Sequence, residues 1–272
     1  MLQSNITQAM DLLAGEILRF AKDKSSNRYI LGGFSRRRFA YALLARQCRA
    51  ESNADSVETL TDVRRRIERQ GVMSYGASAR HINWLRKEAL AEYAIANSLS
   101  AVPTLRFTPK MSSYVLAHAD TWFRASTLLG LSATPQSGCQ PTELSLREQQ
   151  ARLIALDDTY NRLTDTQWRE KIQSLPQGLN TLGADVLLFE VWRLSQVTSA
   201  DSGFKLNKAA LARLAGRSRS SCSQWISALV QARQLRMEYR GYQITDLGRA
   251  TFSGIVEQQL RAYEYAGSIS RQ

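Results

Sequence analysis

The most constraining feature of this sequence of 272 residues is a run of short amphipathic segments between positions 207 and 252. A short helix is predicted over residues 207–215. Gly216 ends it, because glycine tolerates the positive φ common at a helix C-terminus. A longer helix is predicted over residues 221–233. Its apolar side chains fall on one helical face: Cys222, Trp225, Ile226, Leu229 and Val230.

Two short strands are predicted directly after this helix. Residues 235–239 and 242–245 each alternate apolar and polar side chains, and Arg240-Gly241 between them is a two-residue connection typical of a hairpin. A further helix is predicted over residues 246–263, and another over 185–196 precedes the whole series. This order of a helix, a helix–turn–helix, a hairpin and a closing helix is that of a winged helix.

Two stretches also resemble a known family in their residues. Residues 209–221 read Ala-Ala-Leu-Ala-Arg-Leu-Ala-Gly-Arg-Ser-Arg-Ser-Ser, and residues 244–250 read Ile-Thr-Asp-Leu-Gly-Arg-Ala. The first resembles the helix–turn–helix of bacterial winged-helix regulators such as the MarR family, and the second resembles the motif that leaves their wing. The resemblance covers a third of the chain and implies DNA binding. The wing departs from the pattern, because only Arg240 and Gly241 form its tip.

The polar face of residues 221–233 suits a DNA groove. Short polar side chains let a helix approach base edges, and Gln224 can pair with adenine. Arginines at the helix entrance are placed to bind phosphate, where backbone N–H groups also point. The DNA contacts expected from this segment are Arg217, Arg219, Ser220, Ser221, Ser223, Gln224, Ser227, Arg236 and Arg240.

The charge of the chain favours the same partner. It has 36 basic and 24 acidic residues, a net charge of +12, and most of the basic residues are arginine. Residues 1–125 have a net charge of +8, residues 126–180 of −1 and residues 181–272 of +5. Because arginine pairs with phosphate and with guanine edges, double-stranded DNA is the expected partner.

The predicted elements include few strands and indicate a mainly α fold, and two clusters of turn-favouring residues divide it into two domains. Residues 133–142 form the strongest cluster of turn-favouring residues, and residues 174–178 form a second one. We therefore expect an N-terminal helical domain over 1–132, a linker and connector helix over 133–179, and a C-terminal winged-helix domain over 180–272.

The N-terminal domain has two interpretations. Residues 105–115 align with residues 242–252 at a constant offset, and a helix predicted over residues 78–97 precedes them, which suggests a second winged helix. No counterpart is evident for the helix predicted over residues 58–70. The other interpretation is a helical domain for homodimerisation or partner docking. On the first interpretation, the non-apolar side of the helix over 78–97 also includes His81, and the expected DNA contacts of this domain are Arg36, Arg37, Arg38, Arg80, Asn83, Arg86 and Lys87.

No catalytic pattern is found in the sequence. It has two histidines and lacks a Walker A loop, GxGxxG, HExxH and GxSxG. Asp157-Asp158 is the only pair of adjacent acids, and we interpret it as a solvated helix surface because neighbours on a helix diverge. The three cysteines are 91 and 83 residues apart, which argues against a zinc site. We expect no enzyme activity, no cofactor and no metal.

These observations predict a non-catalytic protein that binds double-stranded DNA, in first place a sequence-specific transcription regulator of bacterial, plasmid or phage origin. One alternative is a tandem winged-helix replication initiator of a plasmid or phage. Another is an adaptor whose winged helices dock onto a protein partner. No apolar stretch of 18 residues and no signal peptide is found, so a cytoplasmic, nucleoid-associated protein without membrane contact is expected.

Overall fold

The computed structural model describes residues 2–22, 33–52, 58–94, 104–129, 145–162, 184–198, 203–239 and 241–270. The described residues are mainly helical, as expected. The helices are α1 (Leu2–Lys22), α3 (Phe34–Glu51), α4 (Leu60–Arg69), α5 (Tyr75–Lys87), α6 (Pro109–Thr127), α7 (Leu146–Arg162), α9 (Ala184–Val197), α10 (Lys208–Ala215), α11 (Arg219–Gln231) and α12 (Asp246–Ile269). The strands are β1 (Ala91–Ala94), β2 (Thr104–Phe107), β3 (Leu235–Glu238) and β4 (Gly241–Ile244).

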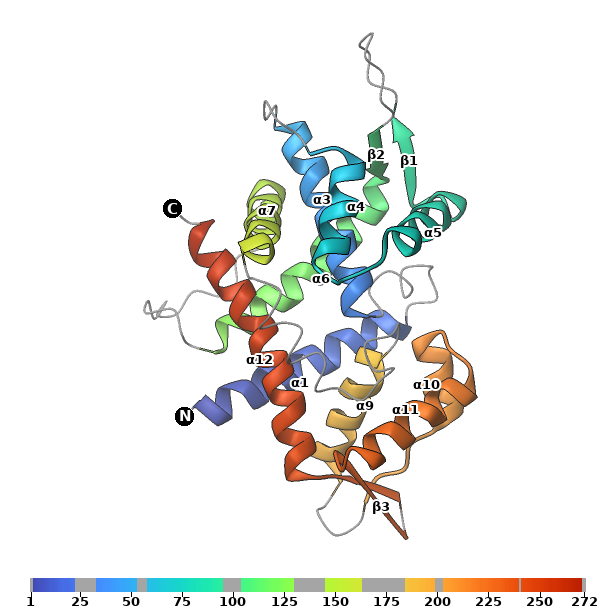
Figure 1. The fold of residues 1–272 in the computed structure, drawn as a ribbon. Helices are drawn as coiled ribbons and strands as arrows, with labels where there is room; N and C mark the ends of the chain where they lie inside the picture. Colours follow the sequence, from blue (N-terminus) through green and yellow to red (C-terminus); the bar gives the residue numbers. More distant parts are fainter. Residues whose placement is uncertain are drawn as a thin grey trace.

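Two groups of elements occupy opposite ends of the molecule in Figure 1. We call α3, α4, α5, β1, β2 and α6 the first unit, and α9, α10, α11, β3, β4 and α12 the second unit. Helix α1 crosses between them and packs on α9 and α6, while α12 leaves the second unit and runs up to α7 (Figure 1). The buried apolar side chains of both units join one continuous core.

Each unit has one antiparallel strand pair. In the first, Ala91 pairs with Phe107, and in the second Leu235 pairs with Ile244. The second pair gains a third partner, because Phe204 and Tyr242 exchange two backbone hydrogen bonds of 2.8 Å. The hairpin predicted near the C-terminus is confirmed.

Short polar residues begin most of these helices. Thr59, Ser74 and Thr108 start the helices α4, α5 and α6, while Asn207, Ser218 and Thr245 start α10, α11 and α12. Each side-chain oxygen accepts a hydrogen bond from a backbone N–H of the first turn, which otherwise has no partner. These helix starts are therefore set by local sequence.

The two units have similar turns between their second and third helices, over residues 70–74 in the first unit and 216–218 in the second. Gly71 after α4 has φ 65°, and Gly216 after α10 has φ 62°. A serine then caps the next helix in both units, Ser74 before α5 and Ser218 before α11. Helix α4 therefore has the same place in its unit as α10 has in the second unit, although no counterpart of residues 58–70 was evident in the sequence.

The repeat continues past the third helix. Ala89 and Arg233 are the only residues other than glycine with positive φ in the described part of the chain, and each follows the third helix of its unit. The next residue then bonds back to the helix at 2.9 Å, Leu90 to Leu85 and Gln234 to Leu229. The third helix of each unit is therefore followed by the same backbone geometry before its strand pair.

One predicted element was too long. The helix expected over residues 78–97 starts at Tyr75 and ends at Lys87, and β1 occupies residues 91–94. Ile82 and Leu85 are buried as predicted, but Ala89 and Tyr93 are exposed. The helical spacing of these last two was coincidental, because the positive φ of Ala89 ends the helix and β1 pairs with β2. The turn clusters at 133–142 and 174–178 lie outside the described residues.

Candidate nucleic-acid interface

Helix α11 has one buried and one exposed face. Cys222, Trp225, Ile226 and Leu229 are buried, as predicted from their spacing. Of the predicted contacts at and before this helix, the exposed ones are Arg217, Arg219, Ser220, Gln224 and Ser227. Ser221 and Ser223 are half-buried, and the Ser221 hydroxyl lies 3.0 Å from that of Ser218 in the helix cap. The predicted polar face thus exists, with Gln224 near its middle.

Basic side chains that the prediction omitted extend this surface. Lys208 and Arg213 on α10 are exposed, as is Lys205 just before it. Helix α10, which carries two of them, packs on α11. Lys208 and Arg213 could have been found from their position on the predicted first helix of the helix–turn–helix, and Lys205 from its place just before that helix.

The hairpin offers less unpaired positive charge to DNA than the sequence predicted. Arg236 is exposed, but its guanidinium pairs with Glu238 and donates to Gln243 Oε1 at 2.7 Å. Arg240 lies outside the described residues. Two apolar side chains near the tip are instead largely exposed, Met237 at 70% and Tyr239 fully.

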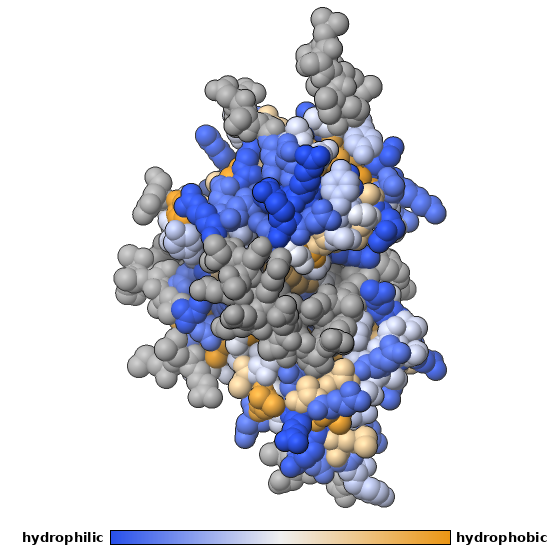
Figure 2. All heavy atoms as spheres, in the orientation of Figure 1, coloured by the Kyte–Doolittle hydropathy of each residue, from blue (hydrophilic) through white to orange (hydrophobic). Residues whose placement is uncertain are grey.

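Helix α5 presents the corresponding surface of the first unit. Arg80, Asn83, Arg86 and Lys87 are all exposed, in agreement with their predicted place on its polar side. The Arg86 guanidinium lies 4.4 Å from the ring centre of Tyr93 on β1, which holds it toward the strand pair. Figure 2 shows hydrophilic residues at the end of the molecule that bears α3, α4 and α5, most densely over α3 and α4.

His81 does not belong to this exposed surface, contrary to prediction. It is buried and stacks on Trp84 with ring centres 5.6 Å apart. Burial and the nearby charge of Arg36 lower the pKa of His81 to about 3, so its ring is neutral in the folded protein. Arg36 itself is half-buried.

The interpretation of Arg37 and Arg38 as phosphate contacts was wrong. Both side chains are only 2% exposed. Arg37 donates to Asp185 Oδ2 at 2.8 Å and to Gln259 Oε1 at 2.6 Å, while Arg38 donates to Asp157 Oδ1 at 2.6 Å. Their acidic partners lie more than 100 residues away in the sequence, so the neighbouring residues give no sign of them.

The interpretation of Asp157 as a solvated residue was wrong as well. Its side chain is fully buried and accepts hydrogen bonds from Arg38, Arg49 and Arg66. Burial alone would raise the pKa of Asp157, but these three guanidinium groups outweigh it and lower that pKa. Asp158 is half-buried, and it pairs with Arg49. The one available signal was the spacing of Arg38 and Arg49, which is three helical turns.

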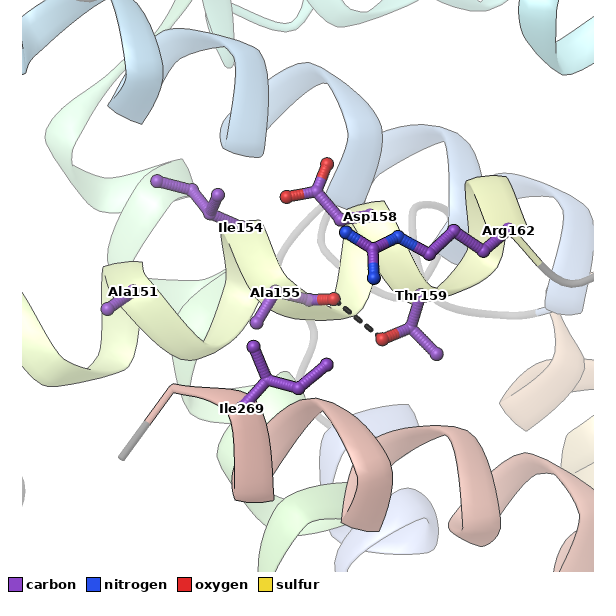
Figure 3. A pocket seen from close by; sticks show the side chains of 7 residues that line it. All are labelled: Ala151, Ile154, Ala155, Asp158, Thr159, Arg162 and Ile269. Carbon is purple, nitrogen blue, oxygen red and sulfur yellow. Dashed lines mark hydrogen bonds between the residues drawn. The ribbon is translucent and has the colours of Figure 1, made fainter. Parts of the chain in front are cut away.

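A hollow of about 290 Å³ lies between α7 and α12 (Figure 3). Ala151, Ile154, Ala155 and Ile269 give it an apolar lining, with Asp158, Thr159 and Arg162 also at its wall. The Thr159 hydroxyl donates to the Ala155 carbonyl at 2.8 Å, a local helix bond. Asp158 is held by Arg49. The hollow thus adds no converging group to the surfaces of α5 and α11.

Among the described residues, no group of three or more His, Cys, Asp or Glu side chains is placed to hold a metal ion. None of the described helices is long and apolar enough to span a membrane. Comparison with known protein families, curated proteins and solved structures finds no match to this chain.

Proposed function

We propose that this protein binds double-stranded DNA sequence-specifically through two winged-helix units, without catalysis. The observation that carries the proposal is the repeated arrangement of a helix, a glycine turn, a serine-capped helix and a strand pair. In DNA-binding proteins of this type the second helix of the helix–turn–helix enters the major groove. Here that helix is α5 in the first unit and α11 in the second.

The exposed side chains of these helices support the proposal. On α11, Gln224 offers an amide for adenine, and Ser220 and Ser227 are short enough to let the helix approach base edges. On α5, Asn83 offers a second amide between exposed cations. Arg217 and Arg219 lie at the start of α11, where phosphate would also meet backbone N–H groups.

The experiment selects bound duplexes from a random pool with the full-length protein and measures affinity by fluorescence anisotropy at several salt concentrations. If six or more phosphates are contacted, affinity should fall about 10³-fold between 50 and 200 mM salt. Association that ignores salt and DNA, and requires a protein partner instead, would favour an adaptor function.

Matched variants separate base contacts from phosphate contacts. Gln224→Ala should relax base preference at a cost of ~1–3 kcal/mol on the selected duplex. Arg219→Ala and Arg80→Ala should weaken all duplexes about equally. Arg19→Ala on α1 is the control, because this arginine is 72% exposed but lies on neither helix. If Gln224→Ala leaves discrimination intact, α11 does not read bases as proposed.

A transcription regulator remains the leading form of this function, and one observation favours a replication initiator. Two complete units in one chain can occupy two half-sites without a second copy, which suits binding to iterated repeats. Enrichment of tandem direct repeats in the selected pool would support the initiator, whereas one isolated site would support the regulator.

A further inference from the structure

One buried arginine joins the two units. Arg37 lies on α3 of the first unit, and its guanidinium reaches two helices of the second unit. Nη1 donates to Asp185 Oδ2 on α9 at 2.8 Å, and Nη2 donates to Gln259 Oε1 on α12 at 2.6 Å. In the sequence, Asp185 lies 148 positions after Arg37, and Gln259 lies 222 positions after it.

The surroundings hold this guanidinium in one place. The central carbon of the guanidinium lies 4.4 Å from the ring centre of Trp122 on α6, so an aromatic side chain of the first unit packs against it. Arg37 is 2% exposed, Gln259 is 7% exposed, and the side chain of Asp185 is 18% exposed. A planar, forked cation with two fixed acceptors and an aromatic support has one favourable orientation.

This geometry has a consequence for the surfaces of α5 and α11. Helix α9 packs on α10, which packs on α11, and α12 follows the hairpin of the second unit. Helix α3 in turn packs on α4, which packs on α5. Arg37 therefore lies where two series of packed helices meet. One series ends at α5 and the other ends at α11.

We propose that Arg37 is a positioning residue that fixes the separation and relative rotation of α5 and α11. The consequence for DNA rests on the proposed function: the protein would accept two half-sites at one spacing and reject others. Arg37 itself would touch no DNA, because its charge is satisfied inside the protein.

The first test measures the positioning without DNA. Spin labels are attached to the full chain at Glu88→Cys after α5 and Gln231→Cys on α11, both exposed positions. Cys48, Cys139 and Cys222 are replaced so that only these labels react. Pulsed electron paramagnetic resonance should give one narrow distance distribution for the parent protein and a broad one for Arg37→Lys, since an ammonium cannot reproduce the fork.

Arg38→Lys is the matched control. Arg38 is the next residue, is equally buried and also makes two side-chain hydrogen bonds, but its partners Asp157 and Asn161 lie on α7. The distance distribution between the two spin labels should stay narrow in Arg38→Lys. Gln259→Leu is a milder change that removes one acceptor and should broaden the distribution partly. It keeps the test decisive if Arg37→Lys fails to fold by circular dichroism.

The second test uses a duplex enriched from the random pool by the parent protein, with five base pairs inserted between its half-sites. The insertion turns one half-site to the opposite face, because a helical turn is about 10 base pairs. The parent should lose about 100-fold in affinity, since the second unit no longer adds to binding. Arg37→Lys should bind the original duplex more weakly and lose only about tenfold on insertion.

The outcomes separate the two proposals. Broadening in Arg37→Lys alone, with a reduced spacing penalty, supports the positioning role. Equal distributions in Arg37→Lys, Arg38→Lys and the parent overturn it, as does equal broadening in both variants. If the parent enriches no duplex, the proposed function fails, and the distance distributions alone decide whether Arg37 sets the arrangement of the units.

Discussion

Replacing Asp157 by alanine should destabilise the protein far more than the same change at Asp158. Asp157 is fully buried and bonds Arg38 at 2.6 Å, Arg49 at 2.9 Å and Arg66 at 3.1 Å. Arg49 keeps Asp158 as a partner, but Arg38 is 2% exposed and would lose the one acidic partner that it has among the described residues. Removing one partner of a buried ion pair costs about 3–5 kcal/mol because the remaining charge stays buried.

The neighbouring acid supplies the control. The side chain of Asp158 is 48% exposed and forms one ion pair, so Asp158→Ala should cost no more than ~1 kcal/mol. Urea unfolding followed by circular dichroism measures both variants. In thermal scans, Asp157→Ala should lower the unfolding midpoint by roughly 6–20 °C, which follows from a loss of about 3–5 kcal/mol at about 2–4 °C per kcal/mol.

The comparison can refute the reasoning directly. Equal losses of stability in the two variants would mean that Asp157 is solvated, as the sequence suggested. Asp157→Asn should fall between them, because its amide keeps one oxygen acceptor but carries no charge to balance the arginines. If Asp157→Ala is as stable as the parent protein, the buried charge of Asp157 makes no net contribution to stability.

Two further predictions concern stability. Gly248→Ala should cost ~1–3 kcal/mol, because a Cβ there would lie 2.1 Å from the carbonyl oxygen of Gln234, whereas Gly254→Ala on the same helix meets nothing within 4 Å and should stabilise by ~0.5–1 kcal/mol. Urea midpoints measure both, and similar changes would contradict the predicted close approach. Burial lowers the pKa of His81 to about 3 and that of His118 well below its usual value. Above pH 6.5 both histidines are neutral in the folded and in the unfolded protein. Below pH 6.5 they bind protons only in the unfolded protein, so the free energy of unfolding should fall by about 1.4 kcal/mol for each histidine with each unit by which the pH is lowered. Unfolding at pH 7.5, 6 and 5 measures this slope, and His118→Gln should reduce it; an unchanged slope would argue that His118 ionises freely in the folded state.

Local sequence determined the helices and strands of the second unit. Gly216, Ser218 and Thr245 act through hydrogen bonds or φ angles within a few residues of themselves, so their roles can be inferred without a fold. The buried stripe of α11 follows from a period of 3.6 residues, which is also a local property. The exposed face of α11 was predictable for the same reason.

Which arginines are buried, and which partners they bind, was decided only by tertiary structure. Arg36, Arg37 and Arg38 are adjacent and chemically alike, but Arg37 faces α9 and α12, Arg38 faces α7 and Arg36 remains half-buried. A charged side chain is buried where packing brings it an opposite charge, and here those charges come from distant segments. Asp157 follows the same rule, because its solvation depended on which helices α7 packs against. The end of α5 was also a tertiary outcome, since Ala89 takes a positive φ without any glycine or proline to signal it, where the chain turns to pair β1 with β2.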